Sequence, residues 1–252
     1  MATLTGSQIE QLIKQARAKG TRIPLQGKDL QYFGLSRFDL KEALLSEANL
    51  SHADLSVANL SGADLSKANL SHANLTETNL TRAKLDHVDL RWASLKQVIL
   101  SQGDLTGSDL TGARVDGADL TEANLHRATL ICNAPRAYLN RATLTEANLH
   151  EANLYHADLK QANLRGATLT KTHLRQANLC EADLSGADLS GANLIEADLR
   201  QANLSGANLS GSDLSGANLI GANLQNTVLK GIKYKDTTWP SGRKGLLGRI
   251  FK

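Results

Sequence analysis

Leucine recurs at every fifth residue along almost the whole of this 252-residue chain. From Leu30 to Leu130 every fifth residue is leucine except Val115, and from Leu139 to Leu229 there is no exception. The residue two positions earlier is nearly always alanine, and the one between them is usually aspartate or asparagine. The chain is therefore a tandem array of five-residue units.

A period of five excludes an ordinary helix and an ordinary strand as the repeating element. Successive leucines on a helix would be rotated by about 500° and would reach every face. On a strand, an odd period would send them to opposite faces. A chain that turns by roughly 90° after each segment would point every leucine inward, and four segments would close one square coil. The sequence predicts an all-β solenoid of stacked coils with a continuous core.

The repeat resembles that of the pentapeptide repeat family. A stretch that carries the resemblance is Ala187-Asp188-Leu189-Ser190-Gly191-Ala192-Asn193-Leu194, and similar units cover roughly residues 25 to 234. The resemblance implies a right-handed quadrilateral β-helix with four repeats per coil, which makes about ten coils here. It also implies a bacterial, especially cyanobacterial, type of protein, most members of which have no assigned activity.

The chain divides into five segments along its length. We expect an N-terminal capping helix (1–24), a first solenoid segment (25–130), a register slip or bulge (131–138), a second solenoid segment (139–234) and a C-terminal cap with a basic tail (235–252). No linker composition separates the two solenoid segments, which predicts one body rather than two domains.

Residues 7 to 19 are expected to form the helix of the first segment. Ser7 and Glu10 fit a capping box with Ser7 as the N-cap, and Gly20 is a suitable helix end. The open end of a solenoid exposes a hydrophobic layer and unpaired strand edges. The helix is therefore interpreted as a cap over the first coil, with partner binding as the alternative.

The register slips once, because Leu130 and Leu139 are nine residues apart instead of ten. Counting back from Leu139 places Ala134 at the leucine position and Cys132 at the small inward position. Pro135 would stiffen the turn that follows. The pattern predicts a bent coil or a small bulge at residues 131 to 137.

Charge is distributed unevenly along the chain, although 28 basic and 25 acidic residues leave a net charge of only +3. Residues 1–24 carry about +3, residues 230–252 about +6, and the repeat body about −6. B-DNA of the same ~48 Å length would carry roughly 28 negative charges. The body is therefore a weak mimic of DNA, and the basic ends do not form a groove-sized surface for binding nucleic acid directly.

Residues twenty apart should stack on neighbouring coils, and one outward column of this kind contains aromatic rings: Tyr32, His52, His72 and Trp92. Two histidines without a third ligand are a poor zinc site, so neither a metal nor another cofactor is expected. The column is interpreted either as a stabilising surface ladder or as a contact for a partner protein, since aromatic residues are enriched in interface hot spots.

The C-terminal tail combines apolar and basic side chains. Its candidate partner-binding residues are Arg243, Lys244, Leu247 and Phe251. The tail could dock on the last coil, on a partner protein or on an anionic membrane surface, where four basic residues would give only weak, reversible binding.

Nothing in the sequence indicates catalysis. Serine, aspartate and histidine occupy interchangeable repeat positions on an outer surface expected to be convex, without a pocket that would exclude water. We therefore expect a non-enzymatic scaffold for protein–protein interaction. The alternatives are a DNA-mimicking regulator or protector of a type II topoisomerase and a scaffold recruited to membranes by its tail. The absence of a secretory signal and of a long apolar run favours a cytoplasmic location. The identity of the partner and the oligomeric state stay open.

Overall fold

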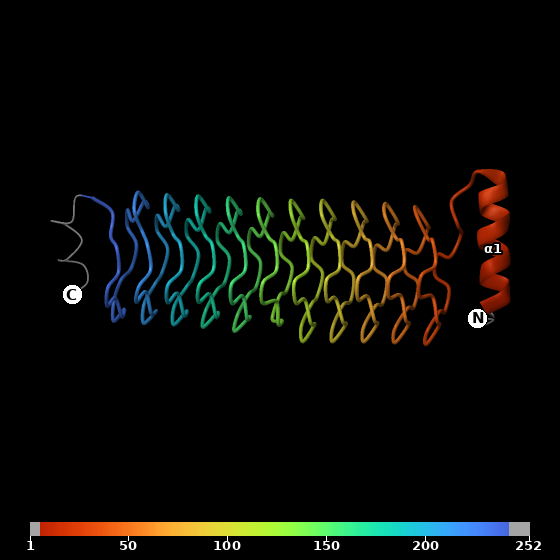
Figure 1. Cartoon of the computed structure of the whole chain (residues 1–252), viewed down its shortest axis with the longest axis horizontal. Helices are drawn as coiled ribbons and strands as arrows, with labels where there is room; N and C mark the ends of the chain where they lie inside the picture. The colour runs from red at the N-terminus through yellow and green to blue at the C-terminus, as the bar shows by residue number, and fades with distance from the viewer. Residues whose placement is uncertain (1–5, 242–252) are drawn as a thin grey trace.

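A computed structural model describes residues 6–241 of the chain. A single helix, α1 (Gly6–Lys19), lies across one end, and the rest of the described chain winds into coils that stack in sequence order (Figure 1).

The coils are joined by a ladder of single-residue parallel bridges rather than by long strands. The bridges link residues twenty apart, from Pro24 with Leu44 to Asn218 with Thr238. One bridge falls every five residues, so each coil has four sides. The all-β solenoid predicted from the period is confirmed.

Each side ends in a two-residue corner. At one such corner the amide of Ala43 donates to the carbonyl of Leu40 at 3.0 Å, closing a β-turn. The second corner residue has a positive φ at nearly every corner, 57° at Glu42 for example. A β-turn whose third residue has positive φ is the type II turn, which is usually filled by glycine. Here most of these residues are not glycine, so the surrounding ladder must stabilise the conformation.

The core contains the leucine and the small residue of every unit, nearly all of them inaccessible to solvent. Leucine amides hold neighbouring coils together, as when Leu65 donates to the carbonyl of Lys84 at 2.8 Å. Each coil thus contributes both a hydrophobic layer and a ring of hydrogen bonds, and the core is continuous from end to end.

At the register slip, one corner contains one residue instead of two. Between Leu130 and Cys132 only Ile131 remains, and the amide of Cys132 donates to the carbonyl of Leu130 at 2.8 Å. Ile131 does not have positive φ, so these three residues form an inverse γ-turn. The irregularity predicted at residues 131 to 137 as a bent coil or a small bulge is therefore a shortened corner, with one residue fewer, and not a bulge. The bridges that span the slip have a spacing of nineteen residues, from Arg114 with Asn133 to Thr129 with Asn148, and a spacing of twenty resumes at Asn133 with Asn153.

The inward positions predicted at the slip are confirmed. Ala134 and Cys132 are both buried in the core. Burial raises the pKa of the Cys132 thiol to about 12, so this side chain stays neutral and packs as a small apolar group.

Helix α1 packs on the first coil through Ile9, Ile13 and Ala16, which belong to the same buried core as the leucines. Gly20 ends the helix with φ of 63°, and the amides of Gly20 and Thr21 donate to Arg17 and Ala16. This is the Schellman arrangement. Because the helix begins at Gly6, Ser7 lies within its first turn, and the prediction of Ser7 as the N-cap is wrong.

An arginine of α1 also occupies part of the open edge of the first coil. Arg17 donates through Nη2 to the carbonyl of Asp39 at 2.8 Å and forms an ion pair with its carboxylate at 2.7 Å. On later coils the equivalent carbonyl accepts from a leucine amide, as Asn59 accepts from Leu40. Arg17 therefore takes the place of a missing coil at this carbonyl.

The C-terminal end is described only as far as residue 241. Tyr234 and Trp239 pack against the last layer with their ring centroids 6.2 Å apart. The rest of the predicted basic tail lies outside the described residues. Within residues 6–241, no helix is both long and apolar enough to span a membrane.

Detaching α1 should expose the end of the solenoid. The change Ile13→Asp would place a carboxylate against the first coil, and burying an unpaired charge is strongly unfavourable. We expect the variant to self-associate in size-exclusion chromatography while its solenoid remains folded by circular dichroism. The neighbouring change Lys14→Asp, on the exposed side of α1, should leave the protein as it was; equal behaviour of the two variants would contradict the packing of α1.

Candidate interaction edge on one corner of the solenoid

The predicted ring column lies along one corner of the first coils. The rings of Tyr32 and His52 are stacked with centroids 4.9 Å apart and 16° between their planes. Those of His52 and His72 are 4.7 Å apart and nearly parallel, at 4°. All three are second corner residues with positive φ, which points their side chains outward in one direction. The stack of these three rings is confirmed.

Trp92 shares the column but not the stack. The ring contacts within the described residues include none between His72 and Trp92. The indole lies instead over Gly112 on the next coil, where a Cβ atom would overlap its six-membered ring. Trp92 is nevertheless 60% exposed. In the sequence, the glycine twenty residues after Trp92, Gly112, indicates this arrangement. The pattern of ring residues alone does not indicate where the indole lies.

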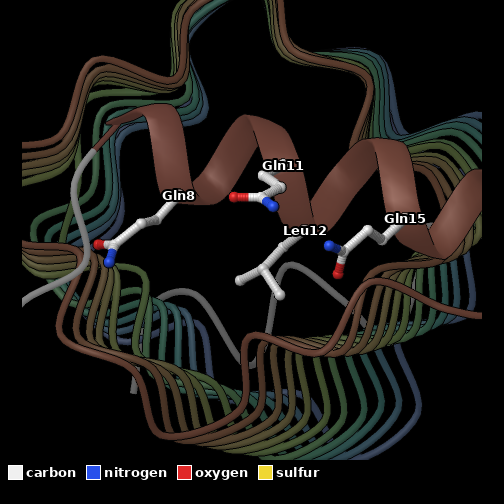
Figure 2. A pocket seen from close by; sticks show the side chains of 4 residues that line it. All are labelled: Gln8, Gln11, Leu12 and Gln15. Atoms are coloured by element: carbon white, nitrogen blue, oxygen red, sulfur yellow. The ribbon is translucent and has the colours of Figure 1, made fainter.

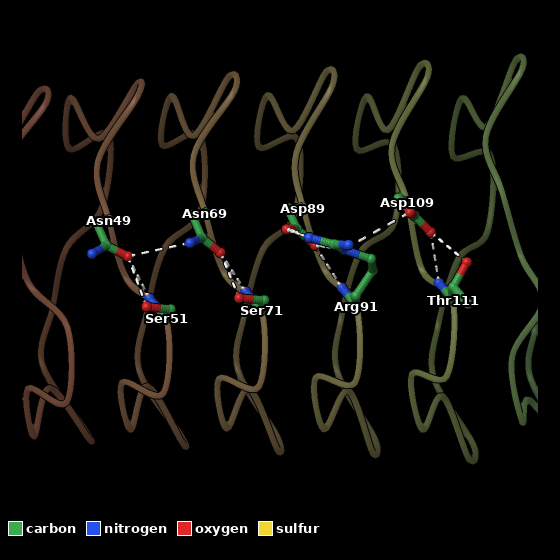
Figure 3. Close-up of polar contacts among 8 residues, drawn as sticks. All are labelled: Asn49, Ser51, Asn69, Ser71, Asp89, Arg91, Asp109 and Thr111. Atoms are coloured by element: carbon green, nitrogen blue, oxygen red, sulfur yellow. Dashed lines mark hydrogen bonds and ion pairs between the residues drawn. The ribbon is translucent and has the colours of Figure 1, made fainter.

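A polar network holds the side of the corner next to the rings (Figure 3). Asn49 Oδ1 accepts from the amide and the hydroxyl of Ser51, at 3.2 and 2.8 Å, and Asn69 binds Ser71 in the same way. Asn69 Nδ2 also donates to Asn49 Oδ1 at 3.4 Å. These asparagines fix the corner backbone, and with it the direction of the neighbouring rings.

An arginine continues this network beside Trp92. Asp89 and Asp109 are the only two carboxylates that stack directly in the bridges of residues 6–241, and Arg91 lies between them (Figure 3). Its guanidinium is 2.6 Å from Asp89 and 4.0 Å from Asp109. The hydrogen bond from Arg91 lowers the pKa of Asp89 against the opposing effect of burial. Arg91 was missed by sequence reasoning, although the spacing Asp89-Leu90-Arg91 indicates it.

The resulting edge combines exposed rings with a fixed cation. We call it the ring edge, defined as Tyr32, His52, His72, Arg91 and Trp92. The other predicted partner-binding residues, Arg243, Lys244, Leu247 and Phe251, lie outside the described residues. Within the described part of the chain, no group of three or more histidine, cysteine or acidic side chains is placed to hold a metal ion.

Two outward columns show how far the surface of the solenoid resembles the continuous negative charge of DNA. Bridges connect Asp54, Asn74, Ser94 and Arg114 in one series, and Asp158, Asn178, Asp198 and Asn218 in another. In both, neutral or basic residues interrupt the carboxylates. Asn178 Nδ2 donates to Asp158 at 2.9 Å, and Asn74 Nδ2 donates to Asp54 at 3.0 Å, so asparagine also serves as a donor to these two aspartates.

A second surface lies where α1 crosses the end of the first coil. Gln8, Gln11, Leu12 and Gln15 line a hollow of about 280 Å³ there (Figure 2). Its lining carries no charged side chain, and it does not adjoin the ring edge.

The family model for pentapeptide repeats matches this chain in eight copies, at residues 29–62, 39–76, 63–102, 104–131, 132–161, 157–194 and 192–231. With most of the chain covered, this protein belongs to the pentapeptide repeat family, whose members form right-handed quadrilateral β-helices.

Among solved structures, the chain is similar to HetL, a pentapeptide repeat protein involved in heterocyst differentiation regulation from the cyanobacterium Nostoc sp. strain PCC 7120. The two are 38% identical, the match covers 87% of this chain and 94% of HetL, and the TM-score is 0.78. Rfr23 from the cyanobacterium Cyanothece 51142 is 48% identical over 38% of this chain and 63% of its own, with a TM-score of 0.30.

A more distant match is QnrB1, a plasmid-mediated fluoroquinolone resistance protein, at 20% identity over 89% of this chain and 95% of its own, with a TM-score of 0.35. At that level QnrB1 supports no conclusion about this protein. No curated protein sequence matches the chain significantly.

The arrangement of Trp92 over Gly112 is testable with a matched pair of variants. Gly112 and Gly211 share the column and have similar φ, 71° and 69°, but only Gly112 faces a ring, since a Cβ on Gly211 would have open space. Alanine at either should cost about 1–2 kcal/mol because of the left-handed conformation.

Gly112→Ala should in addition displace the indole and shift the tryptophan fluorescence, measured with a thermal melt on the same samples. If Gly211→Ala shifts the fluorescence equally, Trp92 does not lie over Gly112.

Proposed function

We propose that this protein is a non-catalytic scaffold for protein–protein interaction and that the ring edge is a contact surface for its partner. In this proposal about ten coils form a rigid rod, α1 closes its first coil, and the outward side chains are presented at fixed spacing. The observation that carries the proposal is the exposed, ordered set of rings on one corner.

The composition of the ring edge suits a protein partner. Tryptophan, tyrosine and arginine are the residue types most enriched in hot spots. In the ring edge they are held in place before binding, by stacking between Tyr32 and His52 and by the ion pair of Arg91 with Asp89. A preorganised surface loses little side-chain entropy on binding, which favours affinity from a small contact.

The similarity to HetL supports a regulatory setting for this scaffold, because that protein is involved in the regulation of heterocyst differentiation. We do not propose the topoisomerase alternative, since the interrupted columns offer no continuous negative surface. Recruitment to a membrane depends on the tail beyond residue 241, and no described residue favours it.

The experiment is affinity capture with variant pairs. Trp92→Ala and Tyr32→Ala remove rings of the ring edge. Ile220→Ala removes an exposed apolar side chain, 52% accessible, from a different corner and serves as the control. Lysate of the organism that encodes the protein is passed over each immobilised variant, and bound proteins are identified by mass spectrometry.

We expect a partner that is captured by the wild type and by Ile220→Ala but lost with Trp92→Ala. Because hot spots contribute at least ~2 kcal/mol, the purified partner should bind Trp92→Ala about thirtyfold more weakly. Capture that is identical for all variants would show that the ring edge is not the contact surface.

A further inference from the structure

The register slip is bordered by an open groove on a corner other than that of the ring edge. The groove has a volume of about 510 Å³, and its lining includes Lys96, Asp116, Pro135, Arg136 and Tyr155. We call it the slip groove. It runs from Thr76 to Tyr155 across five successive coils. Four coil spacings of ~4.8 Å make ~19 Å, the length of about six residues of extended peptide.

Exposed apolar side chains gather around the slip groove. Tyr155 lines it and is 36% exposed. Ile99 and Tyr138 lie two residues after the groove residues Gln97 and Arg136. They belong to one bridge column, with Asp119 between them, and are 41% and 53% exposed. Three of the eight exposed large apolar side chains in residues 6–241 therefore lie in or beside this groove.

The cations at the slip groove have no acceptors. Within residues 6–241, most arginine side chains form an ion pair or a hydrogen bond, and only Arg37, Arg114 and Arg136 form neither. Arg136 lines the groove and Arg114 is two residues before Asp116. The side chain of Lys96 also has no partner among the described residues. Unpaired guanidinium groups are suited to bind carboxylates.

Backbone donors are left open at the same place. On this corner the first residue usually donates its amide to a side-chain oxygen two residues earlier, as Ser56 does to Asp54 at 3.1 Å and Thr76 does to Asn74 at 3.2 Å. In the next two coils this acceptor position, two residues before Lys96 and Asp116, holds Ser94 and Arg114. Within residues 6–241 the backbone amides of Lys96 and Asp116 have no acceptor. The interruption ends at Tyr155, which donates to Asn153 at 3.2 Å.

Asp116 is the one carboxylate in the lining. Its Oδ1 lies 3.5 Å from Asn133 Nδ2, and its Oδ2 is buried without a hydrogen-bond partner. A buried acceptor of this kind is costly unless a donor is supplied. In the lining, the cations Lys96 and Arg136 outnumber this single acidic group.

We propose that the slip groove binds a short, extended segment of a protein that carries carboxylates beside apolar side chains. The unpaired cations and the open amides would receive the carboxylates, while Tyr155, Tyr138 and Ile99 would contact the apolar side chains. This second site is separate from the ring edge, so it goes beyond the proposed scaffold contact and does not depend on it.

The test is selection from a random twelve-residue peptide library displayed on phage, with the full chain as the immobilised target. Parallel selections use Arg136→Glu and Arg37→Glu. These arginines occupy the same turn position on the same corner, and both are unpaired, but Arg37 is remote from the groove. Glutamate already occupies this position at Glu77, so both variants should fold, which a thermal melt will check.

We expect the wild type and Arg37→Glu to enrich acidic peptides that contain aromatic or aliphatic residues, and Arg136→Glu to lose them. A selected peptide, labelled with fluorescein, should bind Arg136→Glu at least tenfold more weakly in an anisotropy titration and Arg37→Glu within about twofold of wild type.

Selection without acidic enrichment would overturn the proposal, and so would equal weakening by both variants, because the attraction would then be diffuse charge. A selected peptide that binds Trp92→Ala normally would confirm that the slip groove acts apart from the ring edge.

Discussion

The fold depends on a corner whose second residue takes a positive φ. For residues other than glycine this conformation costs roughly 1–2 kcal/mol, and the chain adopts it at nearly every corner. Two interactions offset the cost. The leucine amide of each side is bound to the next coil, and at most corners an aspartate or asparagine side chain accepts the amide of the first corner residue. With the corners stabilised in this way, the leucine core forms by stacking nearly identical layers at constant spacing.

A consequence of this regularity is that distinctive surfaces arise where the pattern is interrupted. Trp92 can lie on the next coil only because Gly112 has no side chain. The slip groove appears where Ser94 and Arg114 replace the usual amide acceptors and Pro135 has no amide to donate. At most other corners an asparagine or aspartate accepts the amide of the first corner residue, as Asn49 does for Ser51, so the backbone is satisfied within the solenoid itself. Recognition by this protein is therefore expected at its irregular positions.

Most of the fold was predictable from the sequence because one residue type marks every layer. The spacing of Leu130 and Leu139 located the slip, and Cys132 and Ala134 were assigned to the core correctly. The shape of the slip was not predictable, since a nine-residue interval allows the deletion to fall in a corner or in a side. The stack of Tyr32, His52 and His72 followed from the twenty-residue coil.

Side-chain direction accounts for the remaining misses. The column position of Trp92 lies between those of His72 and Gly112. The indole packs over Gly112, where there is no side chain, and the twenty-residue spacing alone does not show which neighbour it contacts. The slip groove was missed because its residues are scattered from Thr76 to Tyr155 and share no motif. Only the corner geometry brings the unpaired Arg136 next to the open amides.

We expect the solenoid to behave as one cooperative body across the slip, and Cys132 reports on this directly. Its buried thiol has a pKa raised to about 12 and can react only when the structure opens around it. In a Cys180→Ser background, thiol labelling of Cys132 should be measured at increasing urea concentrations below the unfolding transition. For one cooperative body, the free energy of opening and its urea dependence will equal those of global unfolding. Labelling through a smaller opening that is insensitive to urea would show that the slip is a hinge between two separate solenoids.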